Sequence, residues 1–118
     1  MHAMTVRIYH NPRCSKSRQT LQLLEEQSAS PQVVEYLKTP PDADTLSELL
    51  DMLGLEPREL MRRREKEYKE SGADDPKLGR EKLIQLMVQH PKLIERPIVV
   101  SNGKAVIGRP PERVLEIL

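Results

Sequence analysis

Residues 8–18 read Ile-Tyr-His-Asn-Pro-Arg-Cys-Ser-Lys-Ser-Arg and contain the single cysteine of the chain, Cys14. It begins as a short apolar strand, turns at Pro12, and continues after Cys14 into a polar segment typical of a helix start. Helix N-termini and nearby cations both favour the thiolate, which is the reactive form of cysteine. The sequence therefore predicts a reactive thiol at the beginning of a helix.

The segments on either side of Cys14 predict a βαβ unit. Residues 5–10 read as a strand, residues 15–27 as a helix and residues 33–37 as a second strand, with a break at residues 28–31. Two strands joined through a helix in one sheet are expected to run parallel.

Residues 42–90 are predicted to be helical. A first helix carries Leu46, Leu49, Leu50 and Leu53, with Asp42 or Asp44 as its cap and Gly54 at its end. Pro57 opens a short helix, and a charged run and a polar loop follow it. Residues 80–90 form the last helix of this stretch, with a core stripe of Leu83, Ile84, Met87 and Val88.

The C-terminal part returns to strands. Residues 97–100 and 105–107 are predicted strands, and Asn102-Gly103 between them is typical of a type I′ hairpin turn. Pro110-Pro111 opens a final helix, whose inward side chains are expected to be Val114, Leu115 and Leu118. The order of elements predicts an α/β fold: a thioredoxin-like mixed sheet in one domain, residues 1–118, with residues 42–90 as a helical insertion between the second and third strands.

Composition narrows the class of protein. The chain has 118 residues and a formal net charge of +1, which gives no support for nucleic acid or a membrane surface as partner. No apolar run approaches the roughly 20 residues of a membrane span. One cysteine cannot form an intrachain disulfide, and no signal-peptide pattern is visible, so we expect a cytoplasmic protein. We also expect it to be a monomer. No Cys/His cluster has metal-ligand spacing, so we expect no metal.

The neighbours of the cysteine are basic or carry hydroxyl groups: His10, Arg13, Ser15, Lys16, Ser17 and Arg18. Lone cysteines are most often inert core residues, but these polar neighbours argue against burial of Cys14 in an apolar core. Ser15 and Ser17 could donate hydrogen bonds to the sulfur. Ser17 also stands where a dithiol oxidoreductase has its second cysteine, so any redox cycle must take its second thiol from another molecule.

Several segments spread over the chain match one known pattern: Tyr9-His10-Asn11-Pro12-Arg13-Cys14, Tyr36-Leu37 with Thr39-Pro40-Pro41, Arg58-Glu59-Leu60-Met61-Arg62, His90-Pro91-Lys92-Leu93-Ile94, Glu95-Arg96-Pro97-Ile98-Val99-Val100 and Gly108-Arg109-Pro110. With these segments the chain resembles the glutaredoxin-coupled arsenate reductases, which are found in bacteria. The wider group includes the Spx-type transcription regulators. The resemblance implies reduction of arsenate with glutathione as co-substrate, glutaredoxin as partner and no bound cofactor.

The resemblance also implies roles for individual residues. Cys14 falls on the nucleophile, His10 on the histidine that helps keep it deprotonated, and Ser17 on a serine near the sulfur. Pro97, in a cis bond after Arg96, and Asn11 are expected to shape the site. The oxyanion is expected to be held by three arginines: Arg62, Arg96 and Arg109. Guanidinium groups suit this task because their planar fork of donors matches tetrahedral oxyanions.

Local departures from the family pattern keep other functions open. Arg13 replaces a smaller residue, and Ser15-Lys16 replaces a Gly-Thr pair, so the preferred oxyanion is open. One alternative is a glutathione-linked thiol oxidoreductase that acts on another substrate. The other is an Spx-like regulator that binds RNA polymerase without catalysis. Ser17 counts against that second alternative, because an Spx-type switch uses a Cys-x-x-Cys pair.

Overall fold

The predicted βαβ unit is present in the computed structural model, which describes residues 5–27 and 29–118. β1 (Val6–His10) leads into α1 (Ser15–Glu26), and β2 (Gln32–Glu35) follows. β1 and β2 pair in parallel with His10 opposite Glu35, which confirms the expected direction. The first residue of the predicted break, Ser28, lies outside the described residues.

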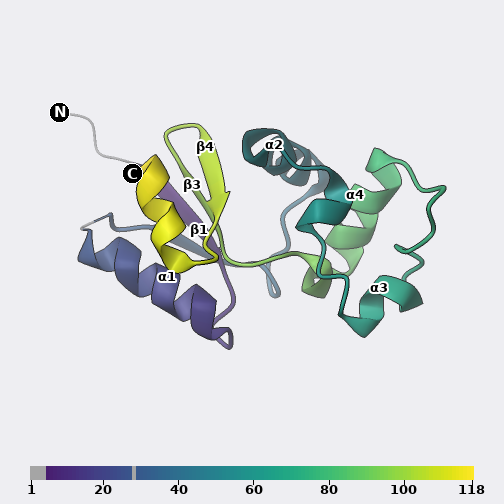
Figure 1. Cartoon of the computed structure of the whole chain (residues 1–118), viewed down its shortest axis with the longest axis horizontal. Helices are drawn as coiled ribbons and strands as arrows, with labels where there is room; N and C mark the ends of the chain where they lie inside the picture. Colours follow the sequence, from purple (N-terminus) through teal and green to yellow (C-terminus); the bar gives the residue numbers. More distant parts are fainter. Residues whose placement is uncertain (1–4, 28) are drawn as a thin grey trace. The chain divides into compact units, whose positions relative to one another are not determined.

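A hairpin completes the sheet on the other side of β1. β3 (Ile98–Ser101) pairs antiparallel with β1 and with β4 (Lys104–Ile107), so the sheet is mixed, with strand order β2-β1-β3-β4. The turn between β3 and β4 has Asn102 at φ 55° and Gly103 at φ 73°. Two consecutive positive φ angles confirm the predicted type I′ hairpin chemistry. η3 (Pro111–Ile117) follows β4 and ends the fold (Figure 1).

The second strand is shorter than predicted. It ends at Glu35, whose carbonyl accepts hydrogen bonds from the backbone N–H groups of both Lys38 and Thr39. These two bonds curl the chain into a turn, so Tyr36 and Leu37 leave the ladder. Tyr36 is nevertheless buried. A buried aromatic residue in this turn gives the same sequence pattern as the end of a strand.

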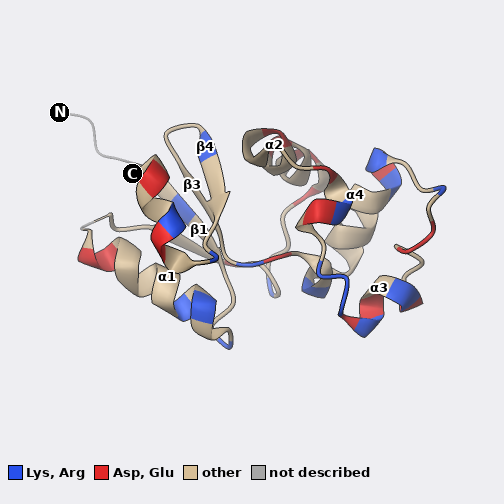
Figure 2. Cartoon of the chain, viewed as in Figure 1, with Lys and Arg blue, Asp and Glu red and all other residues tan. Residues whose placement is uncertain are grey.

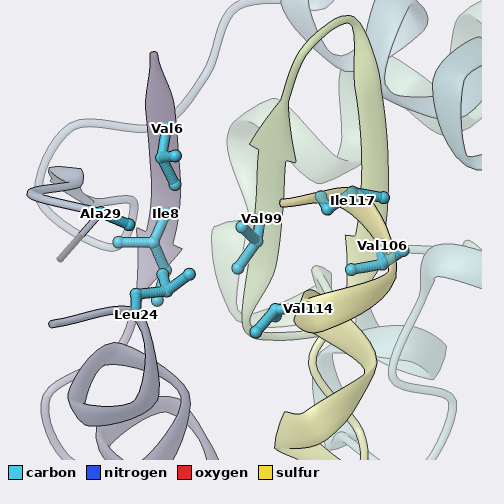
Figure 3. Packing of buried hydrophobic residues seen from close by; sticks show 8 residues of the cluster. All are labelled: Val6, Ile8, Leu24, Ala29, Val99, Val106, Val114 and Ile117. Atoms are coloured by element: carbon cyan, nitrogen blue, oxygen red, sulfur yellow. The ribbon is translucent and has the colours of Figure 1, made fainter. Parts of the chain in front are cut away.

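Helices α1 and η3 cover one face of the sheet and bury a common core with it. Figure 3 shows the side chains of this core pointing toward one another from three strands, both helices and one loop residue: Val6, Ile8, Leu24, Ala29, Val99, Val106, Val114 and Ile117. Each large aliphatic side chain in such a core contributes about 1.5–3 kcal/mol to folding. This core holds α1 against the strands.

The last helix buries a different set of side chains from the one predicted. It is a 3₁₀ helix, in which side chains three residues apart share a face. Pro111, Val114 and Ile117 are therefore buried, whereas Leu115, which was expected inward, is 45% exposed. The expectation for Leu115 was wrong because it assumed the α-helical period of 3.6 residues.

Residues from Pro40 to Glu95 form a second compact unit, which contains the predicted helical insertion. Its elements are α2 (Ala43–Leu53), η1 (Pro57–Leu60), α3 (Lys66–Glu70), α4 (Arg80–Gln89) and η2 (Pro91–Leu93). Asp42 caps α2 by accepting from the Thr45 N–H at 2.8 Å, and Gly54 ends it at φ 68°. The charged run that follows η1, residues 62–67, leads into α3. The sequence pattern did not predict this short helix.

Leucine and methionine side chains fill the interior of this second unit. The buried face of α4 consists of Leu83, Ile84, Leu86 and Met87, so Leu86 takes the place that was predicted for Val88, which is half-buried. Arg80 joins α4 to α2, because its guanidinium contacts Ser47 Oγ at 3.1 Å and Asp51 at 3.0 Å.

The 3₁₀ phase of the last helix is testable by a pair of truncations. We expect Ile117→Ala to lower the free energy of unfolding by about 2 kcal/mol or more, because it leaves a cavity in the core. Leu115→Ala removes a larger exposed surface and is expected to change stability by less than about 0.5 kcal/mol. Urea denaturation of both variants measures this difference. Equal losses would contradict the 3₁₀ assignment.

Candidate active site

Cys14 lies in a tightly hydrogen-bonded turn between β1 and α1. Its backbone N–H donates to the Asn11 carbonyl at 3.0 Å, and the Arg13 N–H donates to Asn11 Oδ1 at 3.0 Å. From the helix side, Arg18 Nη1 reaches back to the Pro12 carbonyl at 2.9 Å. Asn11 therefore organises the turn through both its backbone and its side chain.

The N-terminus of α1 is electrostatically unusual. Cys14 is the N-cap residue, and its side chain makes no capping hydrogen bond to the first turn of this helix. Its first turn carries no acidic residue and its last turn no basic one, and Figure 2 shows blue residues near the start and red ones at the end. This distribution opposes the helix macrodipole. An anion at the N-terminus would therefore be favoured twice, by the dipole and by the side chains.

The thiol is buried to a degree that the sequence did not predict. Cys14 is 8% exposed, and its sulfur accepts a hydrogen bond from Arg109 Nη2 at 3.5 Å. The basic neighbours argued against burial in an apolar core, and the sulfur is buried against a charged group. Arg109, 95 positions away in the sequence, covers the sulfur with a cationic group, so burial here does not mean an apolar surrounding.

The loop that carries Arg109 is held in place from several directions. Arg109 Nε donates to the Arg96 carbonyl at 2.7 Å, and the Gly108 N–H donates to the Pro97 carbonyl at 2.9 Å. The Arg96–Pro97 bond is cis, as the family resemblance implied, and the Arg109–Pro110 bond is cis as well. Of the three predicted arginines, Arg109 thus contacts the sulfur, and the Arg96 backbone holds the Arg109 guanidinium.

His10 and Ser17 form a buried polar pair next to this turn. His10 Nδ1 lies 2.6 Å from Ser17 Oγ, and Ser17 Oγ also accepts the Asn11 N–H at 3.0 Å. The predicted contact of the Ser17 hydroxyl with the sulfur is thus replaced by contacts with His10 and Asn11. Ser15, the other predicted donor, is exposed at the first position of α1.

Burial lowers the pKa of His10, and this is the largest influence on its titration. The carboxylate of Glu35 opposes the shift, and the guanidinium of Arg18 adds to it. The imidazole is therefore favoured in its neutral form near pH 7. A neutral ring can accept a hydrogen bond from Ser17 at Nδ1, so His10 can orient Ser17 without itself carrying charge.

Arg62 belongs to the second unit and is held there by backbone and side-chain bonds. Its N–H donates to the Leu93 carbonyl at 2.7 Å, beside the bridge that joins Met61 to Ile94. Its guanidinium, 28% exposed, contacts Glu65 at 2.5 Å and Glu95 at 3.9 Å. The role predicted for Arg62 in oxyanion binding stays a prediction.

Within residues 5–27 and 29–118, no group of three or more His, Cys, Asp or Glu side chains is placed to hold a metal ion. None of the helices in this described part is long and apolar enough to cross a bilayer.

Sequence reasoning missed Thr20, although a signal for it was present. Thr20 is fully buried and lies three residues after Ser17 and four before Leu24, so all three share the core-facing side of α1. Two hydroxyl side chains on the apolar face of a predicted helix are unusual, because a buried hydroxyl needs a hydrogen-bond partner. That pattern could have indicated a functional role.

Comparison with known proteins identifies the family of this chain. The model of the ArsC family matches residues 9–117, so the chain belongs to the ArsC family. It is 63% identical over 96% of its length to the "Uncharacterized protein YfgD" of Escherichia coli, with 96% of that protein covered. It is 48% identical to a protein of Neisseria meningitidis named "Arsenate reductase", over 96% of this chain and 97% of that one.

A solved structure gives the same result for the fold. The structure named "Arsenate reductase from Vibrio cholerae" is 57% identical and superposes with a TM-score of 0.96, over 99% of this chain and all (100%) of that chain. The predicted fold class, a thioredoxin-like mixed sheet with helices, is thereby confirmed.

The lowered pKa of His10 predicts a pH dependence of stability. Its folded-state pKa lies below the unfolded value of about 6.5, so unfolded protein binds the proton first as pH falls. The contribution of neutral His10 is full above about pH 6.5 and is lost as pH falls through the folded pKa. We expect His10→Gln to flatten the decline in unfolding free energy between about pH 7 and pH 5. The same decline in both proteins, measured by urea denaturation, would contradict it.

Proposed function

We propose that this protein reduces arsenate to arsenite, with Cys14 as nucleophile and with glutathione and glutaredoxin as the source of electrons. The proposal is supported by membership of the ArsC family and by relatives named arsenate reductases at 42–48% identity. The observation that carries it is the 3.5 Å contact between the Cys14 sulfur and Arg109 Nη2 at the start of α1. It joins a nucleophile to a donor suited to oxyanions.

In the proposed first step the thiolate of Cys14 attacks the arsenic of arsenate. A sulfur–arsenic bond forms, and one arsenate oxygen takes up protons and leaves as water. Arg109, Arg96 and Arg62 would hold the remaining oxygens and offset their charge. The first N–H groups of α1, to which the Cys14 side chain makes no capping hydrogen bond, would add further donors for the anion.

Two electrons are then needed to convert As(V) to As(III). They come from two thiols, which are oxidised to one disulfide while arsenite is released. Because the chain holds one cysteine, the second thiol must come from outside, and glutathione fills this role. Glutaredoxin then reduces the mixed disulfide and returns Cys14 to its thiol form.

His10 and Ser17 act on the turn in this scheme. Ser17 holds the Asn11 N–H at 3.0 Å, and His10 holds Ser17 at 2.6 Å, so the pair keeps the cysteine turn in one conformation. Preorganisation of this kind lowers the reorganisation needed when the thiolate reacts.

Activity of two variants tests the roles of the thiol and the arginine. With arsenate, glutathione, glutaredoxin and an NADPH-linked glutathione reductase, we expect NADPH oxidation by the wild type and none by Cys14→Ser. Arg109→Gln is expected to lose about 10- to 100-fold in kcat/KM, the effect of removing a hydrogen bond to a charged group. The matched control is Arg113→Gln, at an exposed position of η3, which should retain activity.

Wild-type turnover no faster than that of Cys14→Ser would refute arsenate reduction by this chain. If the same assay showed consumption of a glutathione mixed disulfide without arsenate, the protein would instead be a glutathione-linked thiol oxidoreductase.

The requirement for an outside thiol gives a separate prediction. Omitting glutaredoxin, or replacing it by a variant without its active-site cysteines, should slow steady-state turnover to near background. A single turnover with glutathione alone should leave glutathione bound to Cys14, and mass spectrometry of the intact protein would detect the added mass. Full steady-state activity without any added thiol would contradict the proposed electron source.

A further inference from the structure

Besides the contact of Arg109 with the sulfur, a buried side chain of α1 contacts the loop that carries Arg109. Thr20 Oγ1, on the core side of α1, lies 2.8 Å from the Lys16 carbonyl and 3.4 Å from the Gly108 carbonyl. The single hydroxyl hydrogen is thus shared between a carbonyl of its own helix and a carbonyl of the loop. Such three-centre hydrogen bonds are common near helix ends.

Gly108 makes this close approach possible. A Cβ atom at this position would lie 2.7 Å from Thr20 Oγ1 and 3.0 Å from Pro97 Cγ. The loop backbone therefore rests directly on the Thr20 side chain, which is fully buried. The next residue after Gly108 is Arg109, whose guanidinium contacts the sulfur.

We infer that Thr20 is a positioning residue that sets the distance between the Cys14 sulfur and the Arg109 guanidinium. Thr20 and Cys14 are carried by the same rigid helix, and Gly108 and Arg109 are adjacent in the same loop. The Thr20 hydroxyl therefore fixes the loop relative to the helix. With arsenate as substrate this inference rests on the proposed function, but the contact between the guanidinium and the sulfur does not depend on a substrate.

Hydroxyl and volume can be separated by two variants. Thr20→Val keeps nearly the same shape and removes the hydroxyl, whereas Thr20→Ser keeps the hydroxyl and removes one buried methyl group. A role in packing alone would be damaged by Thr20→Ser and largely preserved by Thr20→Val. A positioning role through the hydroxyl gives the opposite order.

The rate of Cys14 alkylation by iodoacetamide measures the sulfur–guanidinium contact directly, since the thiolate is the reacting form. At neutral pH we expect Thr20→Val to react about fivefold more slowly than the wild type, because a charge-assisted hydrogen bond to the sulfur is weakened. Thr20→Ser should react at nearly the wild-type rate. In an Arg109→Gln background, Thr20→Val should cause no further decrease, because both changes act through the same contact.

The steady-state assay supplies a second measurement. We expect Thr20→Val to raise KM for arsenate more than it lowers kcat, since the loop arginine binds the anion. Circular dichroism and thermal unfolding confirm that each variant is folded before comparison.

Each outcome decides the inference. It is overturned if Thr20→Val alkylates like the wild type, if Thr20→Ser is the slower of the two, or if the effects of Thr20→Val and Arg109→Gln multiply. The expected alkylation pattern without any arsenate turnover would support the positioning role and refute the proposed function. Arsenate turnover by the wild type, together with unchanged alkylation in Thr20→Val, would support the proposed function and refute the positioning role.

Discussion

The contact between the Cys14 sulfur and the Arg109 guanidinium is the interaction on which the candidate site depends. Without Arg109, Cys14 would be an N-cap residue whose side chain makes no capping hydrogen bond. The charged side chains of its helix would oppose the helix dipole. Arg109 adds a cationic hydrogen-bond donor to the sulfur. Cys14, which is 8% exposed, is thereby buried against a hydrogen-bond donor to its sulfur.

The sheet makes that contact possible. β1 ends at His10 and delivers the cysteine turn, while β3 begins just after the cis Arg96–Pro97 bond, and these two strands are hydrogen-bonded neighbours. β4 pairs with β3 and returns the chain to Gly108, beside Thr20 of α1. The core shared by α1, η3 and the strands holds these ends together (Figure 3). The candidate site thus lies at the ends of strands whose apolar side chains pack in the shared core.

Local rules are broken where chemistry is proposed and are followed elsewhere. Asp42 and Gly54 cap α2 in the ordinary way, and Asn102-Gly103 forms the expected turn. α1, by contrast, has a cysteine as its N-cap residue, lacks an acidic residue in its first turn, and buries hydroxyl groups at Ser17 and Thr20. Departures of this kind are expected at functional sites, because a site ready for a ligand is less stable locally than a fully satisfied structure.

Periodicity and turn chemistry were sufficient to predict the β1–α1–β2 unit, the hairpin and the caps of α2, because these depend on residues close together in sequence. The cysteine and its likeness to the ArsC pattern were also readable from the chain alone. The burial of Cys14, the pairing of Ser17 with His10 and the outward direction of Leu115 required the tertiary structure. So did the contacts of Thr20 with Gly108 and of Arg109 with the sulfur, since they join residues 88 and 95 positions apart. Strand pairing and core packing bring residues so far apart in the sequence into contact, and no local sequence pattern predicts such contacts.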